Sequence, residues 1–462
     1  MEIICPLSKN ISNVYNKQNY NNSLKYRKIM YLKELIINDD YLLYNTLTDE
    51  LILLDKNEYN DFNNENLKDN NFILYQYLIK HWFLVPNDLS EKTMVYLYRN
   101  IFCNDNQPLL NKTINSYTIL TTTDCNARCY YCFELGTKRI NMSKQTAEDV
   151  ANFIIDNSDH NKQINISWFG GEPLFNSEVI DIISEKLTEN GLKYSCGMTS
   201  NGYLFDDSLT DKANTLWNLR KVQITLDGTE KNYNKTKAYI YKNDNNPFET
   251  VLNNIERLVK SNIYVSIRCN ISKYNYLEFY DLIDIIYDRF KDYKNKISMY
   301  FFVLFENIEN NLIIRTDEER NFLYNELYKL EDYCLKKGLH QPSTMRNISG
   351  IKTQHCMADS SNSVMITPEG NLGVCEHYID SNFFGSIYDN KLDRDYNNLN
   401  EWRQKHNEFE QCNTCCYYTK CNRLKKCVPI KSMEYPLCYN KINRKTEVAI
   451  KTEYEKFKLN NN

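Results

Sequence analysis

Three cysteines in the first half of the chain have the spacing of a ligand set for a metal cluster. Cys125, Cys129 and Cys132 follow one another as C-x3-C-x2-C, directly after a predicted β-strand. A loop can fold three such thiolates around one cuboidal iron–sulfur cluster and leave the fourth iron without a protein ligand. A zinc knuckle is the alternative for the same thiols, although it does not explain the surrounding βα pattern.

A second group of cysteines lies in the carboxyl-terminal quarter of the chain. Cys356 is followed after thirteen residues by Gly370 and after four more by Cys375. Further cysteines stand at Cys412, Cys415, Cys416, Cys421, Cys427 and Cys438. Because C-x2-C pairs suit zinc as well as iron–sulfur clusters, a four-thiolate zinc site at Cys412 to Cys438 is an alternative.

Composition describes an ordinary soluble chain of two or three domains. It has 462 residues, 42% of them apolar, and 56 basic side chains against 60 acidic ones. This balance excludes the positive field that gathers nucleic acid or anionic lipid. No signal peptide and no apolar run of about 18 residues is present. We therefore expect a cytoplasmic protein without a nucleic-acid or membrane partner.

Sixteen cysteines are informative in that compartment. Reducing conditions disfavour disulfides, so metal binding or catalysis is the usual reason to keep many thiols. Buried apolar roles are expected for Cys5, Cys103, Cys196 and Cys269.

The middle of the chain alternates short β-rich runs with amphipathic helices. Strands are expected near 117–123, 164–170, 193–199, 221–226, 263–269 and 298–304. This alternation is typical of βα units around a parallel sheet. In one helix, the apolar residues between Phe248 and Val259 repeat at helical spacing, so one face should pack on the sheet. Another helix should begin at Thr316 and end before Gly338.

Several glycine-rich and polar segments follow these strands at their carboxyl ends, where parallel βα barrels build active sites. They are Trp168-Phe-Gly170-Gly171-Glu172-Pro173, Thr199-Ser-Asn201-Gly202 and Thr225-Leu-Asp227-Gly228. Together with the cysteine triad, and with Tyr131 before its last cysteine, they resemble the landmarks of the radical S-adenosylmethionine (radical SAM) enzymes. The resemblance implies that the open iron chelates S-adenosylmethionine and that the reduced cluster cleaves it to methionine and a 5′-deoxyadenosyl radical.

The resemblance also implies roles for individual residues. The cofactor-binding residues would be Tyr131, Gly170, Gly171, Glu172, Asn201, Thr225 and Lys237. Glu172 and the adjacent backbone would meet the methionyl amino group, and the Thr225 hydroxyl would lie near the cofactor carboxylate. Relatives usually carry His and Arg where this chain has Tyr233 and Lys237. Because Lys lacks the bidentate fork of Arg, Lys237 is either a point charge beside that carboxylate or an ordinary exposed lysine.

The carboxyl-terminal cysteines resemble the SPASM pattern of two auxiliary clusters. The first half, C-x9-15-G-x4-C, is complete, whereas two residues are extra before Cys427. The resemblance assigns Cys412, Cys415, Cys421 and Cys438 to one cluster, and Cys356, Cys375 and Cys427 to another. Cys416 is a possible substitute for a neighbour, and Cys334 is the nearest upstream thiol for a fourth ligand of the second cluster. The cofactors implied are three four-iron clusters and S-adenosylmethionine.

The expected fold is α/β, with a partial (β/α)6 radical SAM barrel at 109–315 and a linking helix and bridge at 316–345. A SPASM domain is expected at 346–462 and a small winged-helix-like domain at 1–108. The winged-helix-like domain is expected from an apolar hairpin pattern at Tyr41 to Leu54 and helical patterns at Phe72 to Leu78 and Leu89 to Ile101. The resemblance implies a ribosomally made precursor peptide as substrate. The amino-terminal domain would bind its leader as an added strand, and a reducing partner such as flavodoxin or ferredoxin would supply electrons.

Three reactions compete for this architecture. Thioether crosslinking from Cys thiols to carbon leads, because a vacant auxiliary iron suits thiolate ligation, and carbon–carbon crosslinking is an alternative. Formylglycine formation is the runner-up: the segment from Pro368 to His377 resembles anaerobic sulfatase maturases, and the resemblance implies that Glu376 would be the catalytic base. The plain alternative for Glu376 is a surface carboxylate. A non-catalytic metal-stabilised binding module would have no use for the Cys125 triad.

Overall fold

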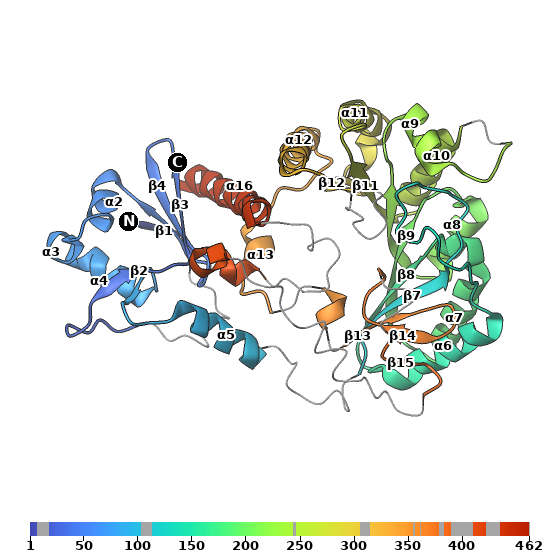
Figure 1. Cartoon of the computed structure of the whole chain (residues 1–462), viewed down its shortest axis with the longest axis horizontal. Helices are drawn as coiled ribbons and strands as arrows, with labels where there is room; N and C mark the ends of the chain where they lie inside the picture. The colour runs from blue at the N-terminus through green and yellow to red at the C-terminus, as the bar shows by residue number, and fades with distance from the viewer. Residues whose placement is uncertain are drawn as a thin grey trace. The chain divides into compact units, whose positions relative to one another are not determined.

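The computed structural model describes residues 1–6, 18–102, 113–243, 246–304, 315–353, 356–360, 362–377, 383–389, 410–421 and 435–461 (Figure 1). The chain divides into two compact units. The N-terminal unit comprises Met1–Gln107, Pro342–His355 and Lys405–Asn462, and the barrel unit comprises Pro108–Gln341 and Cys356–Gln404. No helix among the described residues is both long and apolar enough to cross a bilayer.

The barrel unit is built on parallel strands that follow one another in chain order. They are β7 (Ser116–Thr122), β8 (Ile164–Gly170), β9 (Tyr194–Ser200), β10 (Leu219–Thr225), β11 (Tyr264–Ile271) and β12 (Ile297–Val303). Every neighbouring pair among them is parallel. This confirms the α/β fold and the partial (β/α)6 barrel. Each strand begins and ends within about two residues of its predicted range, the usual uncertainty of element boundaries.

Helices connect these strands, and a further helix, α12 (Asp317–Lys336), follows β12 (Figure 1). They are α6 (Lys144–Asn157), α7 (Ser177–Glu189), α8 (Asp207–Thr215), α9 (Glu230–Lys237), α10 (Pro247–Lys260), α11 (Glu278–Phe290) and α12 (Asp317–Lys336), with 3-10 turns η3 (Pro173–Asn176) and η4 (Lys291–Tyr293). The apolar face of α10 is buried, as its periodicity predicts. Thr316 caps α12 by accepting a hydrogen bond from the Glu319 amide at 3.2 Å, and Gly338 follows the helix with φ +74°.

The segment that carries Cys356 and Cys375 extends the barrel sheet. After η5 (Met357–Asp359), β13 (Ser363–Ile366) pairs with β7 in parallel, and β14 (Asn371–Gly373) and β15 (Gly385–Ser386) continue the sheet in antiparallel register. Met365 packs on Leu120 in a small apolar cluster. Residues that follow the linking helix therefore belong to the barrel's own sheet.

The N-terminal unit contains a four-stranded antiparallel sheet in the order β1 (Glu2–Cys5), β5 (Leu51–Leu54), β4 (Asp40–Asn45), β3 (Leu32–Ile37). A small ribbon pairs β2 (Tyr26–Lys28) with β6 (Leu84–Pro86). The helices are α2 (Lys56–Phe62), α3 (Leu67–Asn70), α4 (Phe72–Lys80) and α5 (Glu91–Phe102). The predicted hairpin and both predicted helices are confirmed.

The N-terminal unit also includes two later parts of the chain, at 342–355 and from 405 onward. They contain α13 (Met345–Ile348), η6 (Glu410–Thr414), η7 (Tyr418–Lys420) and α16 (Tyr435–Asn461). Ala449 and Ile450 of α16 are buried against Leu42 and Leu53 of the sheet. The compact units thus divide the residues expected to form one domain at 346–462, because β13 pairs with the barrel whereas α16 buries its apolar face on the N-terminal sheet.

Candidate active site at the carboxyl ends of the barrel strands

The three cysteines of the triad lie in the loop that follows β7. Cys125 Sγ accepts a hydrogen bond from the Ala127 amide at 3.3 Å, and the Cys132 amide donates to the Cys129 carbonyl at 3.2 Å. Burial raises the pKa of Cys125 and of Cys132 to about 12, with smaller contributions from nearby acidic groups and thiols. The loop alone therefore favours neutral thiols, and a bound metal centre would be needed to hold them as thiolates.

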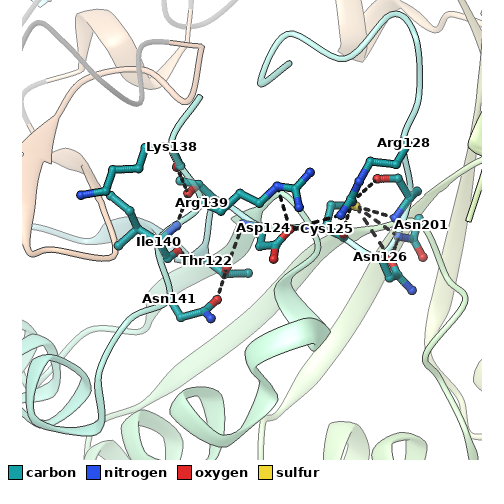
Figure 2. Close-up of polar contacts among 12 residues, drawn as sticks. Thr122, Asp124, Cys125, Asn126, Arg128, Lys138, Arg139, Ile140, Asn141 and Asn201 are labelled. Atoms are coloured by element: carbon teal, nitrogen blue, oxygen red, sulfur yellow. Dashed lines mark hydrogen bonds and ion pairs between the residues drawn. The ribbon is translucent and has the colours of Figure 1, made fainter. Parts of the chain in front are cut away.

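Polar contacts close this loop at its base (Figure 2). Asp124 lies 3.4 Å from the Arg139 guanidinium, and the Thr122 hydroxyl donates to the Asn141 side chain at 2.5 Å. The Thr123 hydroxyl donates to the Lys138 carbonyl at 2.7 Å. The outgoing and returning strands of the loop are thus tied together before the first cysteine, which restricts the positions that the thiols can adopt.

The Gly170–Gly171 turn lets the end of β8 approach the cysteine loop. The Gly171 amide donates to the Thr122 carbonyl at 3.0 Å, and the next amide donates to the Asp124 carbonyl at 2.9 Å. A Cβ on Gly170 would lie 2.1 Å from the Thr122 oxygen, and one on Gly171 2.2 Å from the Asp124 oxygen. Gly170 also has φ +131°, a conformation open mainly to glycine. Both positions therefore require glycine.

Glu172 joins the ends of β8 and β9 from inside the protein. Its side chain is 0% exposed. It accepts hydrogen bonds from the Asn201 amide at 2.7 Å, the Ser200 hydroxyl at 2.9 Å and the Leu174 amide at 3.2 Å. Burial raises its pKa to about 7, against the lowering effect of these donors. Its contact with a methionyl amino group stays a prediction.

Asn201 brings the end of β9 to the first cysteine (Figure 2). Its side-chain amide donates to Asn126 Oδ1 at 2.6 Å and lies 3.7 Å from Cys125 Sγ. The T-S-N-G segment and the cysteine motif, 76 residues apart, are thus in direct contact. The sequence predicted this proximity through the rule that strand ends share one edge of a parallel sheet.

Lys237 is buried, so its interpretation as an ordinary exposed lysine is wrong. It is 2% exposed, and its ammonium lies 3.0 Å from Asp227, 2.9 Å from the Thr225 hydroxyl and 3.3 Å from the Tyr131 hydroxyl. Its three protons have three oxygen partners within the protein. The Lys237 carbonyl also accepts from the Arg128 amide at 2.8 Å.

Asp227 belongs to the Thr225–Gly228 motif, but the sequence did not reveal its role in the site. Tyr131 donates to Asp227 Oδ2 at 2.5 Å, and Asn270 donates to Oδ1 at 3.0 Å. The carboxylate thus connects the aromatic residue of the cysteine motif with the ends of β10 and β11. Together with Lys237, it forms a buried network that positions the triad loop.

Glu134 is a second residue that the sequence analysis missed. It follows Cys132 by two residues, is 9% exposed, and neither carboxylate oxygen has a hydrogen-bond partner among the described residues. Burial raises its pKa to about 8. An acidic residue beside an aromatic one gives no sequence signal for burial, since Glu is usually exposed.

The segment after Cys375 lies beside the cysteine loop. The rings of His377 and Phe133, the residue next to Cys132, are 4.7 Å apart. The pKa of His377 is lowered, mainly by burial and to a smaller extent by Arg268 of β11, against the opposing effect of Glu376. Glu376 is half-buried and directly precedes His377 in the sequence. Its role as a base stays a prediction.

The remaining cysteines fall into different places. Cys356 and Cys375 belong to the barrel unit, whereas Cys412, Cys415, Cys421 and Cys438 belong to the N-terminal unit. Cys427 and Cys103 lie outside the described residues. Cys196 and Cys269 are buried as expected, and Cys5 is half-buried. Cys334 is fully buried in α12, near Cys269, where an apolar side chain would also fit.

The donor set around the triad fits a cuboidal cluster. The described cysteines are all free thiols. No three Cys, His, Asp or Glu side chains among the described residues converge as tightly as the ligands of one metal ion. A cuboidal cluster needs no such convergence, because each thiolate binds a different iron. Three free thiols on one closed loop therefore supply what such a cluster requires.

Comparison with known proteins agrees with this geometry. Residues 119–286 match the Radical SAM superfamily. A GTP 3',8-cyclase of Clostridium perfringens is 25% identical over 291 residues, which cover 58% of this chain and 82% of that protein. Two solved structures share the fold. The structure of anSMEcpe with AdoMet and Cp18Cys peptide is 16% identical and covers 74% of this chain and 98% of that chain, with a TM-score of 0.53. The structure of Streptococcus suis SuiB with precursor peptide SuiA is 13% identical and covers 89% of this chain and 98% of that chain, with a TM-score of 0.52. Residues 119–286 therefore form a radical SAM domain, and the chain that carries this domain is an enzyme.

Proposed function

We propose that this enzyme modifies a ribosomally made precursor peptide with a 5′-deoxyadenosyl radical. The radical SAM domain implies S-adenosylmethionine and one four-iron cluster, which Cys125, Cys129 and Cys132 would hold. The observation that carries the proposal is the convergence of the triad loop, the Gly170–Glu172 turn and Asn201 at one end of the barrel. When bound, the cluster supplies the electron that splits the sulfonium bond and generates the radical.

The chain's own residues prepare the site for this chemistry. The two glycines of the β8 turn let its backbone lie directly against the cysteine loop, where a side chain would meet the Thr122 and Asp124 carbonyl oxygens. Glu172 and the Lys237–Asp227 pair hold three strand ends in fixed positions. Because these charged groups are already satisfied by protein partners, their main contribution is to position the loop rather than to take up the substrate.

A peptide substrate is supported by the N-terminal unit and by structural relatives. SuiB was crystallised with the precursor peptide SuiA, and anSMEcpe with a peptide. Among the described residues, β3 is an edge strand that pairs only with β4, and its Ile36 is 57% exposed. An edge of this kind can accept an extended peptide as an added strand. We propose that the leader of the precursor binds there.

Thioether formation is the reaction that we favour. Cys334 packs as a core residue of α12, which supports an auxiliary cluster that lacks it as a fourth ligand. Cys356, Cys375 and Cys427 would then hold a cluster with one iron open to a substrate thiolate. Carbon–carbon crosslinking uses the same radical without that ligation. Formylglycine formation remains the alternative that uses Glu376 as base, because this half-buried carboxylate directly precedes His377, whose ring lies beside that of Phe133.

The experiment combines cofactor cleavage with analysis of the peptide. Anaerobically reconstituted enzyme with dithionite and S-adenosylmethionine should release 5′-deoxyadenosine, and Cys129→Ala should abolish this release. Cys196→Ala, which removes a thiol from the core of β9, is the matched control and should retain it. Unchanged release in Cys129→Ala would refute the proposal.

Coexpression with a short Cys-bearing candidate precursor peptide then decides the reaction. Loss of two hydrogen atoms with one thiol no longer alkylated indicates a thioether, and the same loss with all thiols alkylated indicates a carbon–carbon bond. Conversion of Cys to an aldehyde that reacts with hydrazines indicates formylglycine. A Ser-for-Cys peptide that is still crosslinked would exclude the thioether.

A further inference from the structure

The segment 410–421, called here the cysteine segment, carries Cys412, Cys415 and Cys421 with little regular structure. Its described elements are the two short turns η6 and η7. A segment of this kind buries little apolar surface of its own, so partners or metal must hold its conformation. Several of its partners lie in the first hundred residues of the chain, among them Thr46, Asp49 and Arg99.

Thr46, in the turn between β4 and β5, holds the centre of the cysteine segment. Its hydroxyl donates to the Cys416 carbonyl at 2.5 Å. Thr419 returns a hydrogen bond to the Thr46 carbonyl at 2.8 Å, and the two hydroxyls are 3.0 Å apart. Both threonines are fully buried, so in the folded protein water does not compete for these hydrogen bonds.

A buried ion pair fixes the next residue. The Lys420 ammonium pairs with Asp49 from the same β4–β5 turn, and both side chains are almost completely buried. Asp49 also accepts from the Tyr44 hydroxyl at 2.8 Å and from the Gly350 amide at 2.6 Å. Lys420 donates in addition to the Gly350 carbonyl at 3.1 Å. The pair therefore joins three separate parts of the sequence at one point.

Arg99 of α5 reaches the backbone of a cluster cysteine itself. It is 5% exposed, and its guanidinium donates to the Lys352 carbonyl at 2.9 Å, to the Tyr418 carbonyl at 2.9 Å and to the Cys421 carbonyl. The guanidinium also lies 5.1 Å from the centre of the Tyr418 ring. The rigid fork of Arg suits several carbonyls at once, which the single ammonium of Lys does not.

The helix that carries Cys438 is docked on the same sheet. Tyr439, the next residue, packs on Tyr417 of the cysteine segment with ring centres 5.3 Å apart, and Tyr417 donates to Asn443 of α16 at 2.7 Å. Further along α16, Glu447 lies 2.8 Å from Lys33 of β3. All four cysteines expected in one auxiliary cluster are thus on elements that the N-terminal sheet supports.

We propose that the N-terminal unit is the platform of this auxiliary metal centre, with Thr46 and Arg99 as positioning residues of its cysteine segment. The inference rests on the auxiliary centre of the proposed function, but it does not depend on which metal occupies the centre. It assigns the first hundred residues a second role besides leader recognition. Deleting them would remove the support of the cysteine segment, so a deletion cannot test leader binding alone.

The test uses full-length protein in which Cys125, Cys129 and Cys132 are replaced by Ala, so that the triad holds no cluster. In this background, Thr46→Val and Arg99→Met are compared with Arg27→Met. The Arg27 guanidinium pairs with Glu91 in the same unit, and its other hydrogen-bond partners among the described residues are the Lys28 and Leu89 carbonyls, outside the cysteine segment. Metal content and the electron paramagnetic resonance spectrum of the reduced protein are measured after anaerobic purification.

We expect at least a twofold loss of bound metal, or a changed spectrum, in Arg99→Met, a smaller change in Thr46→Val, and none in Arg27→Met. Arg99→Lys should restore part of the signal. Circular dichroism and leader binding, which report the N-terminal sheet, should be retained in Thr46→Val. Metal content and spectra of Thr46→Val and Arg99→Met that equal those of Arg27→Met would overturn the inference.

The two proposals fail in distinguishable ways. If the triad-free protein contains stoichiometric zinc and no iron, the auxiliary iron–sulfur clusters are wrong, whereas loss of that zinc in Arg99→Met still supports the platform. If iron is present and insensitive to both positioning residues, the clusters stand and the platform is wrong.

Discussion

Replacing Lys237 by Met should destabilise the barrel more than any surface substitution, because it leaves a carboxylate buried without its cation. Asp227 and Lys237 each have only 2% of their side chains exposed. Removing one partner of a buried pair costs about 3–5 kcal/mol, since the other charge keeps its desolvation penalty. Asp227 keeps its hydrogen bonds to Tyr131 and Asn270, so we expect the lower part of that range, about 3 kcal/mol.

The double variant Lys237→Met/Asp227→Asn distinguishes the loss of the ion pair from the cost of leaving one charge buried alone. Both charges are then gone, so the loss should fall to about 1–2 kcal/mol, less than the loss in Lys237→Met alone. Thermal unfolding of cluster-free protein gives the ranking. Hydrogen exchange of peptides from β10 and β11 assigns the change to the barrel unit.

The pH dependence follows from Lys237. Burial lowers the pKa of Lys237, but the combined attraction of Asp227 and the neighbouring tyrosine and cysteine side chains outweighs it and holds the pKa well above its usual value of 10.5. A raised Lys pKa contributes stability that is complete below the unfolded value of 10.5 and is lost only as pH rises through the folded pKa. The effect of Lys237→Met should therefore be constant between about pH 6 and 9. Wild-type stability in Lys237→Met, with a large loss of S-adenosylmethionine binding, would refute this reasoning and place the ammonium on the cofactor.

Three further outcomes are expected. Gly171→Ala should at least halve the iron of the triad cluster, because its Cβ would lie 2.2 Å from the Asp124 oxygen; Gly197→Ala, where the nearest atom lies at 3.8 Å, should retain the iron. Glu134→Gln should be more stable than the wild type, with a gain that grows from about pH 4.5 to 8, because the raised pKa of Glu134 makes its ionisation in the folded state unfavourable. At about 1.4 kcal/mol per pKa unit, the upper limit of this gain in unfolding free energy is about 5 kcal/mol. An unchanged pH profile of unfolding would contradict the prediction. Iron analysis should give about twelve irons per chain, and the triple Ala variant of the triad should lose about a third of them.

Local sequence patterns were sufficient to predict the barrel. Strand and helix periodicities depend on residues a few positions apart, and the Thr316 cap and Gly338 mark the ends of α12 through short-range hydrogen bonds and backbone freedom. The proximity of Asn201 to Cys125 followed from topology, since parallel strands end at one edge of the sheet.

Long-range pairing was not predictable by the same means. β13 is a run of four residues that pairs with β7, more than 240 positions earlier in the chain. A run this short has no period that distinguishes a strand from a turn of helix. The division of residues 346–462 between two units follows from this pairing and from the docking of α16, and neither leaves a local pattern.

The burial of Lys237 was also hidden in the sequence. α9 ends at Lys237, and Ala238 follows with φ +45°, a left-handed conformation that alanine seldom adopts. Backbone hydrogen bonds from Arg128 to the Lys237 carbonyl and from Ile240 to the Asn126 carbonyl hold this turn against the cysteine loop. The turn is held by partners over a hundred residues away in the sequence. A local pattern therefore could not predict that this lysine is buried.

The two units solve the same physical problem in the same way. A cysteine-rich loop has few apolar side chains with which to form a core, yet its thiols must be held near their final positions before a cluster binds. In the barrel unit, the Lys237–Asp227 pair contacts the triad loop through Tyr131, and in the N-terminal unit, Lys420 of the cysteine segment pairs with Asp49 of the β4–β5 turn. Buried pairs add little net stability compared with apolar packing, but their hydrogen bonds accept few alternative geometries. We infer that these charges are retained for the conformation that they select, which lowers the ordering cost of metal binding at both loops.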